Sequence, residues 1–142
     1  MDHVVYLDAK ADELNKILSK EKTMIIRGAT GRKLPYGRVN IGDVLYFINN
    51  NAEGIVKAKA IVQNVFNSDK MDEAESIELV KSNQDKLKLT DKQFERWAGK
   101  RYIVLIEITA AQLCSEEFRI DKSSYSNMDD WLPVENIDSV KE

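Results

Sequence analysis

Two apolar segments joined by a short polar turn constrain the fold more strongly than any other feature of this sequence. Residues 43–48 contain the run Val-Leu-Tyr-Phe-Ile, which is typical of a strand covered on both faces. Residues 49–54 read Asn-Asn-Asn-Ala-Glu-Gly, a turn signal, and residues 55–66 continue as a long strand. This arrangement predicts a β-hairpin.

Other strands are expected on both sides of this hairpin. Residues 3–7 read as an opening strand, and residues 23–27, Thr-Met-Ile-Ile-Arg, read as a buried one. Residues 102–109 are apolar on both faces, which predicts a central position in the sheet. Residues 117–120 and 132–137 are shorter strand candidates.

Three helices are expected between these strands. The first runs from a cap at Asp8 to about residue 19, and the second from residue 68 or 69 to about residue 87. Thr90 and Gln93 have capping-box spacing and start a third helix, which Gly99 ends. Because hairpins dominate and βαβ alternation is absent from this order, the sequence predicts an α+β fold. Its mixed, mostly antiparallel sheet curls into a small barrel with flanking helices.

Length and composition point to one globular domain covering residues 1–142. The single cysteine, Cys114, excludes an internal disulfide, and the single histidine, His3, lacks a second Cys or His partner for an ordinary zinc site. We therefore expect no metal and no cofactor. The N-terminus has no signal-peptide pattern, and the apolar runs are far shorter than the roughly twenty residues of a membrane span. A cytoplasmic protein without membrane association is expected.

A basic loop follows the strand at 23–27. Residues 22–42 contain five cations and no acid, whereas the whole chain has a formal net charge of −3. Glycines in the loop let backbone amides approach a phosphate, and its cations supply the opposite charge. The sequence therefore predicts a nucleic-acid contact through phosphate neutralisation by Arg27, Arg32, Lys33 and Arg38, with Tyr36 as a stacking surface for a base.

This loop has three other interpretations. A P-loop fails because the glycines are too close together, no Ser or Thr follows Lys33, and Pro35 opposes an immediate helix. The GxxG loop of KH domains matches residues 28–31 literally, but that loop lies between helices and this one follows a strand. An ordinary solvated surface loop remains open as the third interpretation.

Several motifs together resemble the PUA-like superfamily, which includes the ASCH and EVE domains. They are the basic loop, the segment Asn-Ile-Gly-Asp-Val-Leu-Tyr-Phe at 40–47, the strand Gly-Ile-Val-Lys-Ala-Lys-Ala at 54–60, and Trp97 followed by the strand at 102–108. The closing segment Asn-Met-Asp-Asp-Trp-Leu-Pro at 127–133 resembles a small, largely archaeal family of uncharacterised proteins in that superfamily. The resemblance implies a pseudo-barrel with helices at its ends and a cleft beside the basic loop.

The resemblance also implies a choice of functions. PUA domains bind structured RNA, EVE domains are thought to read modified bases, and some small ASCH proteins hydrolyse acylated cytidine. Gly31, Lys33 and Arg38 match three elements of the ASCH pattern, but Tyr36-Gly37 replaces its acid. The leading hypothesis is therefore a non-catalytic module that binds RNA or a modified nucleotide.

Two alternatives remain beside this hypothesis. One is an amidohydrolase acting on a modified nucleoside, in which Lys33 activates the Thr30 hydroxyl with Glu107 as carboxylate partner. The other is a protein-interaction module that uses an acidic C-terminal surface. The sequence leaves the oligomeric state open.

Overall fold

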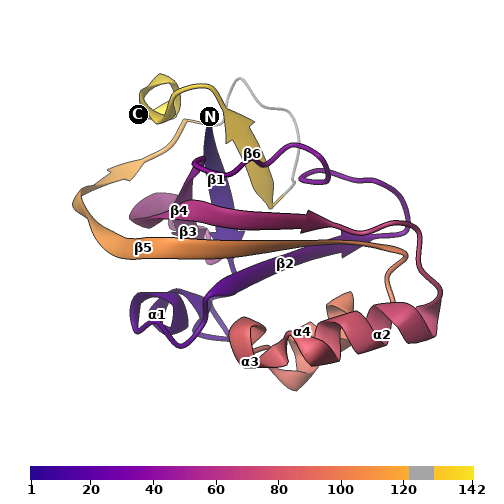
Figure 1. Cartoon of the computed structure of the whole chain (residues 1–142). Coiled ribbons are helices and arrows are strands. Elements are labelled where there is room, and N and C mark those ends of the chain that lie inside the picture. The colour runs from indigo at the N-terminus through magenta and orange to yellow at the C-terminus, as the bar shows by residue number, and fades with distance from the viewer. Residues whose placement is uncertain (122–129) are drawn as a thin grey trace.

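A curled six-stranded sheet forms the body of the computed structural model, which describes residues 1–121 and 130–142 (Figure 1). The strands lie in the order β2-β5-β4-β3-β1-β6. The β1–β3 pair is parallel and the other neighbouring pairs described are antiparallel, so the prediction of a mixed, mostly antiparallel sheet is confirmed. The strand bounds are β1 (Asp2–Leu7), β2 (Met24–Ala29), β3 (Val44–Asn49), β4 (Ile55–Asn67), β5 (Tyr102–Arg119) and β6 (Trp131–Val134).

The curl of the sheet comes from its two longest strands. β3 and β4 form the predicted hairpin, and β4 then pairs with β5 through three register shifts. Bulges of this kind bend a strand and increase its twist. Ala110, at φ 54°, lies within β5, and the strand continues past the predicted end at residue 109. β5 thus includes residues 117–119, and its predicted central position is confirmed because it lies between β2 and β4.

The first helix is shorter than the sequence predicts. α1 spans Glu13–Leu18, because the chain first makes a turn in which the Asp8 carboxylate accepts a hydrogen bond from the backbone N–H of Ala11. Asp12 then adopts the left-handed conformation at φ 56°, which a helix cannot include. The prediction of a helix from Asp8 to residue 19 is therefore wrong in its first turn.

The second predicted helix is divided in two. α2 (Glu73–Ser82) begins only after Asp72, whose side chain forms a capping box with Glu75, so residues 68–72 lie outside it. Asn83 breaks the helical conformation at φ −110°, and α3 (Gln84–Leu87) follows as a single short turn. α4 (Asp91–Trp97) starts at the predicted Thr90–Gln93 capping box, which is confirmed.

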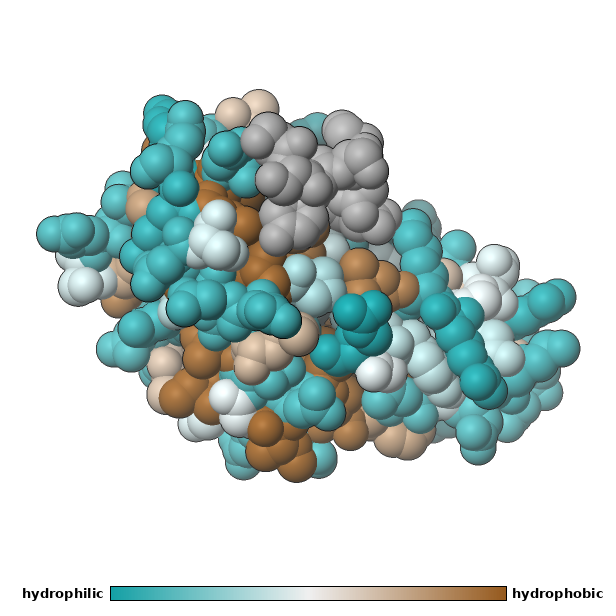
Figure 2. Space-filling view, turned by 90° about the horizontal axis from the view of Figure 1, so that it is seen from above, coloured by the Kyte–Doolittle hydropathy of each residue, from teal (hydrophilic) through white to brown (hydrophobic). Residues whose placement is uncertain are grey.

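Apolar side chains fill both sides of β2. Ile25 points into the inside of the curled sheet, where it packs in a cluster with Phe47 and Trp131. Met24 and Ile26 point to the opposite face, where α2, α3 and α4 cover them. The predicted burial of this strand is therefore confirmed, and the structure shows that both of its faces are covered. Figure 2 shows a mainly hydrophilic surface from above, with apolar side chains emerging between the polar ones.

The C-terminal segment closes the far edge of the sheet. β6 pairs antiparallel with β1 and ends at Val134, so the predicted strand at 132–137 is shorter than expected. Residues Ile137–Val140 form a 3-10 helix whose first N–H donates to the Asp2 carboxylate. Within the ranges that the structure describes, no helix has the length and apolar character needed to cross a bilayer.

Candidate functional site

A cleft of about 190 Å³ opens at the C-terminal end of β2. It lies between the loop that follows β2 and the segment that joins α4 to β5. Its charged lining residues are Arg27, Lys33, Arg96, Lys100 and Asp130, and its aromatic lining residues are Tyr36, Trp97 and Tyr102; Gly28, Ala29, Gly31, Leu34 and Val104 complete the wall. We call this the cationic cleft, because four of the five charged residues in its described lining carry a positive charge.

The pairing of β2 with β5 brings the two walls together. Ala29 pairs with Tyr102, and Gly28 pairs with Ile103. A Cβ atom on Gly28 would lie 3.2 Å from the backbone oxygen of Tyr102 and 3.3 Å from the Cβ of Lys100. Both distances are below ordinary van der Waals contact, and a paired strand cannot retreat. Gly28 therefore allows the close approach of the two segments that line the cleft.

The end of α4 places Trp97 and Lys100 at the cleft. Gly99, at φ 96°, adopts the left-handed conformation that lets the chain turn sharply from the helix into β5. Its N–H donates to the hydroxyl of Ser76 at 3.0 Å, which ties this turn to α2. Arg96 packs its guanidinium over the Trp97 ring at 4.3 Å from the ring centroid. The helix end thus supplies two cations and one aromatic wall.

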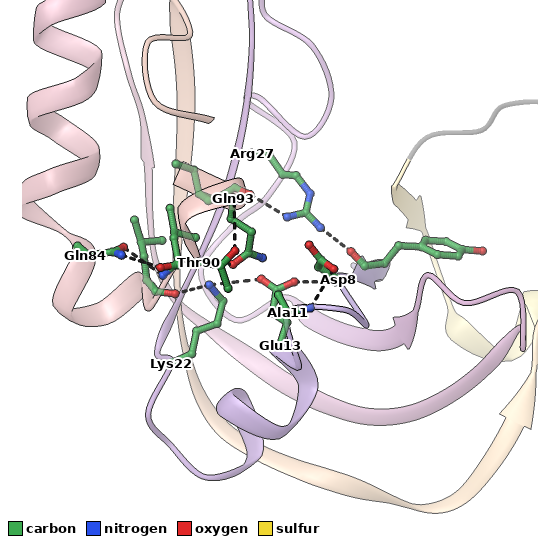
Figure 3. Close-up of polar contacts among 12 residues, drawn as sticks. Asp8, Ala11, Glu13, Lys22, Arg27, Gln84, Thr90 and Gln93 are labelled. Atoms are coloured by element: carbon green, nitrogen blue, oxygen red, sulfur yellow. Dashed lines mark hydrogen bonds and ion pairs between the residues drawn. The ribbon is translucent and has the colours of Figure 1, made fainter. Parts of the chain in front are cut away.

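Arg27 forms the inner end of the cationic cleft. Its side chain is 7% exposed, and it donates hydrogen bonds to the backbone oxygens of Ile26 and Tyr6 at 2.8 and 2.7 Å (Figure 3). The guanidinium also lies 5.7 Å from the Trp97 ring centroid and 5.6 Å from that of Trp131. Such contacts hold a cation in place while leaving its charge to act on the cleft.

Arg27 also carries a donor on its Nε atom. It lies 3.0 Å from the Asp130 Oδ2 atom, but the direction of the N–H bond does not meet hydrogen-bond geometry. Nε is thus a buried donor without a hydrogen-bond partner in the described parts of the chain, and its contact with Asp130 is an ion pair only. Asp130 also lies 3.8 Å from the Nη2 atom of Arg96. One half-buried carboxylate thus serves two guanidinium groups.

A buried hydrogen-bonded chain supports Trp131 behind Arg27. The indole Nε1–H of Trp131 donates to Nδ1 of His3 at 3.1 Å, and Nε2 of His3 lies 2.8 Å from the Asp43 carboxylate. Because an indole N–H can only donate, Nδ1 must accept and Nε2 must carry the hydrogen that goes to Asp43. The network therefore assigns a neutral histidine with its proton on Nε2.

Burial and hydrogen bonding shift the pKa values of both His3 and Asp43. Desolvation lowers the pKa of His3, and this effect exceeds the opposing effect of the Asp43 carboxylate. Desolvation raises the pKa of Asp43, but hydrogen bonds from His3 and from the backbone N–H of Asn40 outweigh it, so the net shift is downward. Both shifts favour the neutral imidazole beside an ionised carboxylate.

Tyr36 and Tyr102 form the opposite wall. Their rings meet edge to face at 5.7 Å, and the guanidinium of Arg32 lies 5.6 Å from each ring centroid. The Tyr36 hydroxyl donates to the backbone oxygen of Ser68 at 2.5 Å, which fixes the loop against the end of β4. Tyr36 is therefore a fixed wall whose ring already contacts Arg32. The stacking role predicted for it requires a base to share or replace that contact.

The structure brings only some of the predicted residues to the cleft. Arg27, Lys33 and Tyr36 line it, and Arg32 borders it through its contact with the two tyrosines. Arg38 is exposed but is not part of the lining. Lys22, part of the basic stretch, is 1% exposed and lies 3.3 Å from Glu13, so it contributes no surface charge (Figure 3).

The three residues of the amidohydrolase alternative are not assembled. Thr30 is exposed just beyond β2, and Lys33 lines the cleft. Glu107 pairs with Met24 at the opposite end of β2, five residues along β5 from Tyr102, a separation of roughly 17 Å at the rise of a strand. Its carboxylate lies 3.6 Å from Lys86. The geometry does not place Glu107 beside Lys33 as that mechanism requires.

Sequence reasoning missed Arg96, Lys100 and Asp130 as cleft residues. The sequence does carry a signal for Arg96 and Lys100. Both cations lie close to Gly99, which ends α4, and the strand that follows pairs with β2. Asp130 carries no such local signal. In the described residues, no group of His, Cys, Asp or Glu is arranged to hold a metal ion.

Comparisons with known proteins identify the fold. No protein-family model and no curated protein matches the sequence. The solved structure of ASCH from Zymomonas mobilis matches with a TM-score of 0.65 and 13% identity, covering 99% of this chain and 96% of that chain. The structure of a tyrosine-to-phenylalanine variant of the same protein matches with a TM-score of 0.68 and 14% identity, covering 97% of this chain and 93% of that chain. The chain has the fold of an ASCH protein.

The ASCH fold confirms the predicted PUA-like pseudo-barrel. At 14% identity the similarity extends to the fold, and no activity follows from it. The resemblance to a largely archaeal family stays a prediction, and residues 127–129 of the segment quoted for it lie outside the described residues.

Proposed function

We propose that this protein is a non-catalytic module that binds RNA or a modified nucleotide in the cationic cleft. The observation that carries the proposal is the charge of the cleft lining: among the described residues it has four cations and a single acid, on a chain of net charge −3. A positive cleft on an acidic body concentrates anions locally and repels them elsewhere. The ligand is therefore expected to bring its negative charge to this one place.

The size and walls of the cleft favour a nucleotide over other anions. Its volume of about 190 Å³ lies below the roughly 300–1,000 Å³ of sites that enclose a drug-sized ligand. It therefore suits one group of a larger molecule, such as one phosphate with part of its sugar or base. Trp97, Tyr36 and Tyr102 supply aromatic surface at the same site, and aromatic side chains beside cations are the usual means of holding single-stranded nucleic acid. The ASCH fold agrees with this proposal.

The test is a fluorescence-anisotropy titration of labelled single-stranded RNA at several salt concentrations. The double variant Lys33→Ala/Lys100→Ala is expected to bind more weakly and to lower the salt slope by roughly 0.7 for each phosphate that it no longer neutralises. The matched control is Lys59→Ala/Lys81→Ala, which removes the same charge from residues outside the cleft lining. Equally weakened binding in both double variants would refute the cleft as the binding site, and absence of binding by the wild type would refute the function.

A further inference from the structure

Asp130 lies beside two arginines of the cationic cleft, at the position that the anionic group of a ligand would take. Asp130 is the only acid among the described residues that line the cleft, and its carboxylate lies 3.0 Å from Arg27 Nε and 3.8 Å from Arg96 Nη2. We propose that Arg27 and Arg96 form a subsite for a terminal phosphate, and that Asp130 is an internal anion which the phosphate displaces. The inference rests on the proposed function and names the ligand group at the same site.

The unmatched donor of Arg27 is the first argument for displacement. Its Nε–H is buried and has no hydrogen-bond partner in the part of the chain that the structure describes, although Asp130 lies within reach. A buried donor left without an acceptor destabilises its surroundings. An anion with several oxygens, placed against the same guanidinium, can meet that donor in a geometry that the tethered carboxylate does not reach.

The exposure of the participants is the second argument. The Asp130 side chain is 37% exposed and that of Arg96 is 59% exposed, whereas that of Arg27 is 7% exposed. Arg27 is held by two backbone oxygens and two indole rings, so it is the fixed partner. Asp130 and Arg96 are the exposed partners, so a ligand can reach both side chains from solvent. The site thus combines a buried, fixed cation with a second, exposed cation and an exposed competing anion.

Competition with Asp130 determines the ligand class. A ligand carboxylate gains little, because it only replaces one carboxylate by another. A phosphodiester within a chain carries a single negative charge and has only two oxygens free for contacts. A terminal phosphomonoester carries about −1.5 to −2 charges and three acceptor oxygens, so it is the group that outcompetes Asp130. The built-in acid therefore selects nucleotide or RNA ends over interior phosphates and over carboxylate metabolites.

The experiment uses the tryptophans as reporters, because both tryptophans of the chain contact Arg27. Tryptophan fluorescence is titrated with inorganic phosphate for the wild type, Asp130→Asn and Arg96→Ala. Asp130→Asn keeps the shape of the side chain and is expected to bind phosphate about tenfold more tightly. Arg96→Ala removes an exposed cation and is expected to bind phosphate about tenfold more weakly. The charge-matched control is Asp138→Asn, an exposed acid outside the cleft lining.

Three results would overturn the inference. The first is an Asp130→Asn variant that binds phosphate no more tightly than Asp138→Asn, and the second is an Arg96→Ala variant that binds it like the wild type. The third applies when RNA binds, and it is RNA whose 5′- and 3′-phosphorylated forms bind no better than the hydroxyl-ended form. Arg96→Ala alters only an exposed side chain, so it decides the question even if Asp130→Asn is misfolded. Phosphate binding with no RNA binding would leave this inference standing and refute only the proposed function.

Discussion

His3 offers a direct test of how the inner wall of the cationic cleft is held, because it is the only histidine in the chain. A proton on Nδ1 would face the indole N–H of Trp131, which also donates. The pKa of His3 is lowered by burial in the folded protein, whereas the unfolded chain titrates near pH 6.5. Between these two pKa values, the unfolded state binds more protons than the folded state. The contribution of His3 to the free energy of unfolding is therefore fully present above about pH 6.5, and it decreases as the pH falls below that value.

The variant His3→Phe measures the size of this effect. It leaves the Nε1–H of Trp131, a fully buried residue, without an acceptor, at a cost of about 1–3 kcal/mol. Asp43 keeps the backbone N–H of Asn40 at 2.9 Å, so removing its histidine partner adds about 1 kcal/mol. The free energy of unfolding is expected to fall by about 2–4 kcal/mol at pH 7.5, which lowers Tm by roughly 6–15 °C.

The assay is urea and thermal denaturation of both proteins from pH 5.5 to pH 7.5. The wild type should lose up to about 1.4 kcal/mol for each pH unit below 6.5, and His3→Phe should be nearly flat over the same range. Asp43, with its lowered pKa, titrates below this range. A variant that keeps the wild-type slope, or a wild type with no slope, would refute the assignment of the neutral, indole-bonded histidine.

Two further predictions concern the residues that support β2. Lys22→Ala should lower the free energy of unfolding by about 3–5 kcal/mol, because it leaves the buried Glu13 carboxylate without its cation. The double variant Lys22→Met/Glu13→Leu should recover most of that stability. Chemical denaturation measures both variants, and equal stability of the two would contradict the ion-pair argument. Gly28→Ala should lower the free energy of unfolding by about 1–3 kcal/mol, because its methyl group meets the Tyr102 backbone oxygen at 3.2 Å. Gly31→Ala is the control, because nothing lies within 4 Å of a Cβ atom there. Equal unfolding temperatures for the two variants would contradict the prediction.

Sequence reasoning predicts those parts of the fold that depend only on residues close together in the chain. The hairpin of β3 and β4 and the capping box at Thr90 need only residues that are adjacent in the chain. The first helix was mispredicted because Asp8 can cap a helix or close a turn with Ala11, and the pattern fits both outcomes. The length of β5 depends on register shifts against β4, which the sequence of either strand alone does not encode.

The same division applies to the cationic cleft. Arg27 and Lys33 were predicted because they lie in one basic stretch after a buried strand. Lys100 reaches the cleft only because β5 pairs with β2 in a register that joins Tyr102 to Ala29, residues that lie far apart in the sequence. Asp130 directly precedes β6, which is placed by its pairing with β1. Only the sheet topology reveals that these segments share one site.

Arg27 shows why the core and the cleft are not independent. An arginine at the end of a buried strand must find acceptors and an opposite charge, because an unpaired buried cation is strongly unfavourable. Its Nη groups take two backbone oxygens, its plane lies near two indole rings, and its opposite charge comes from Asp130 on the surface. The same three contacts fix the guanidinium and leave Nε beside the only acid of the described lining. We therefore expect stability to depend on the carbonyl and indole contacts and the proposed anion selectivity to depend on Asp130, so substitutions at these two groups should separate folding from binding.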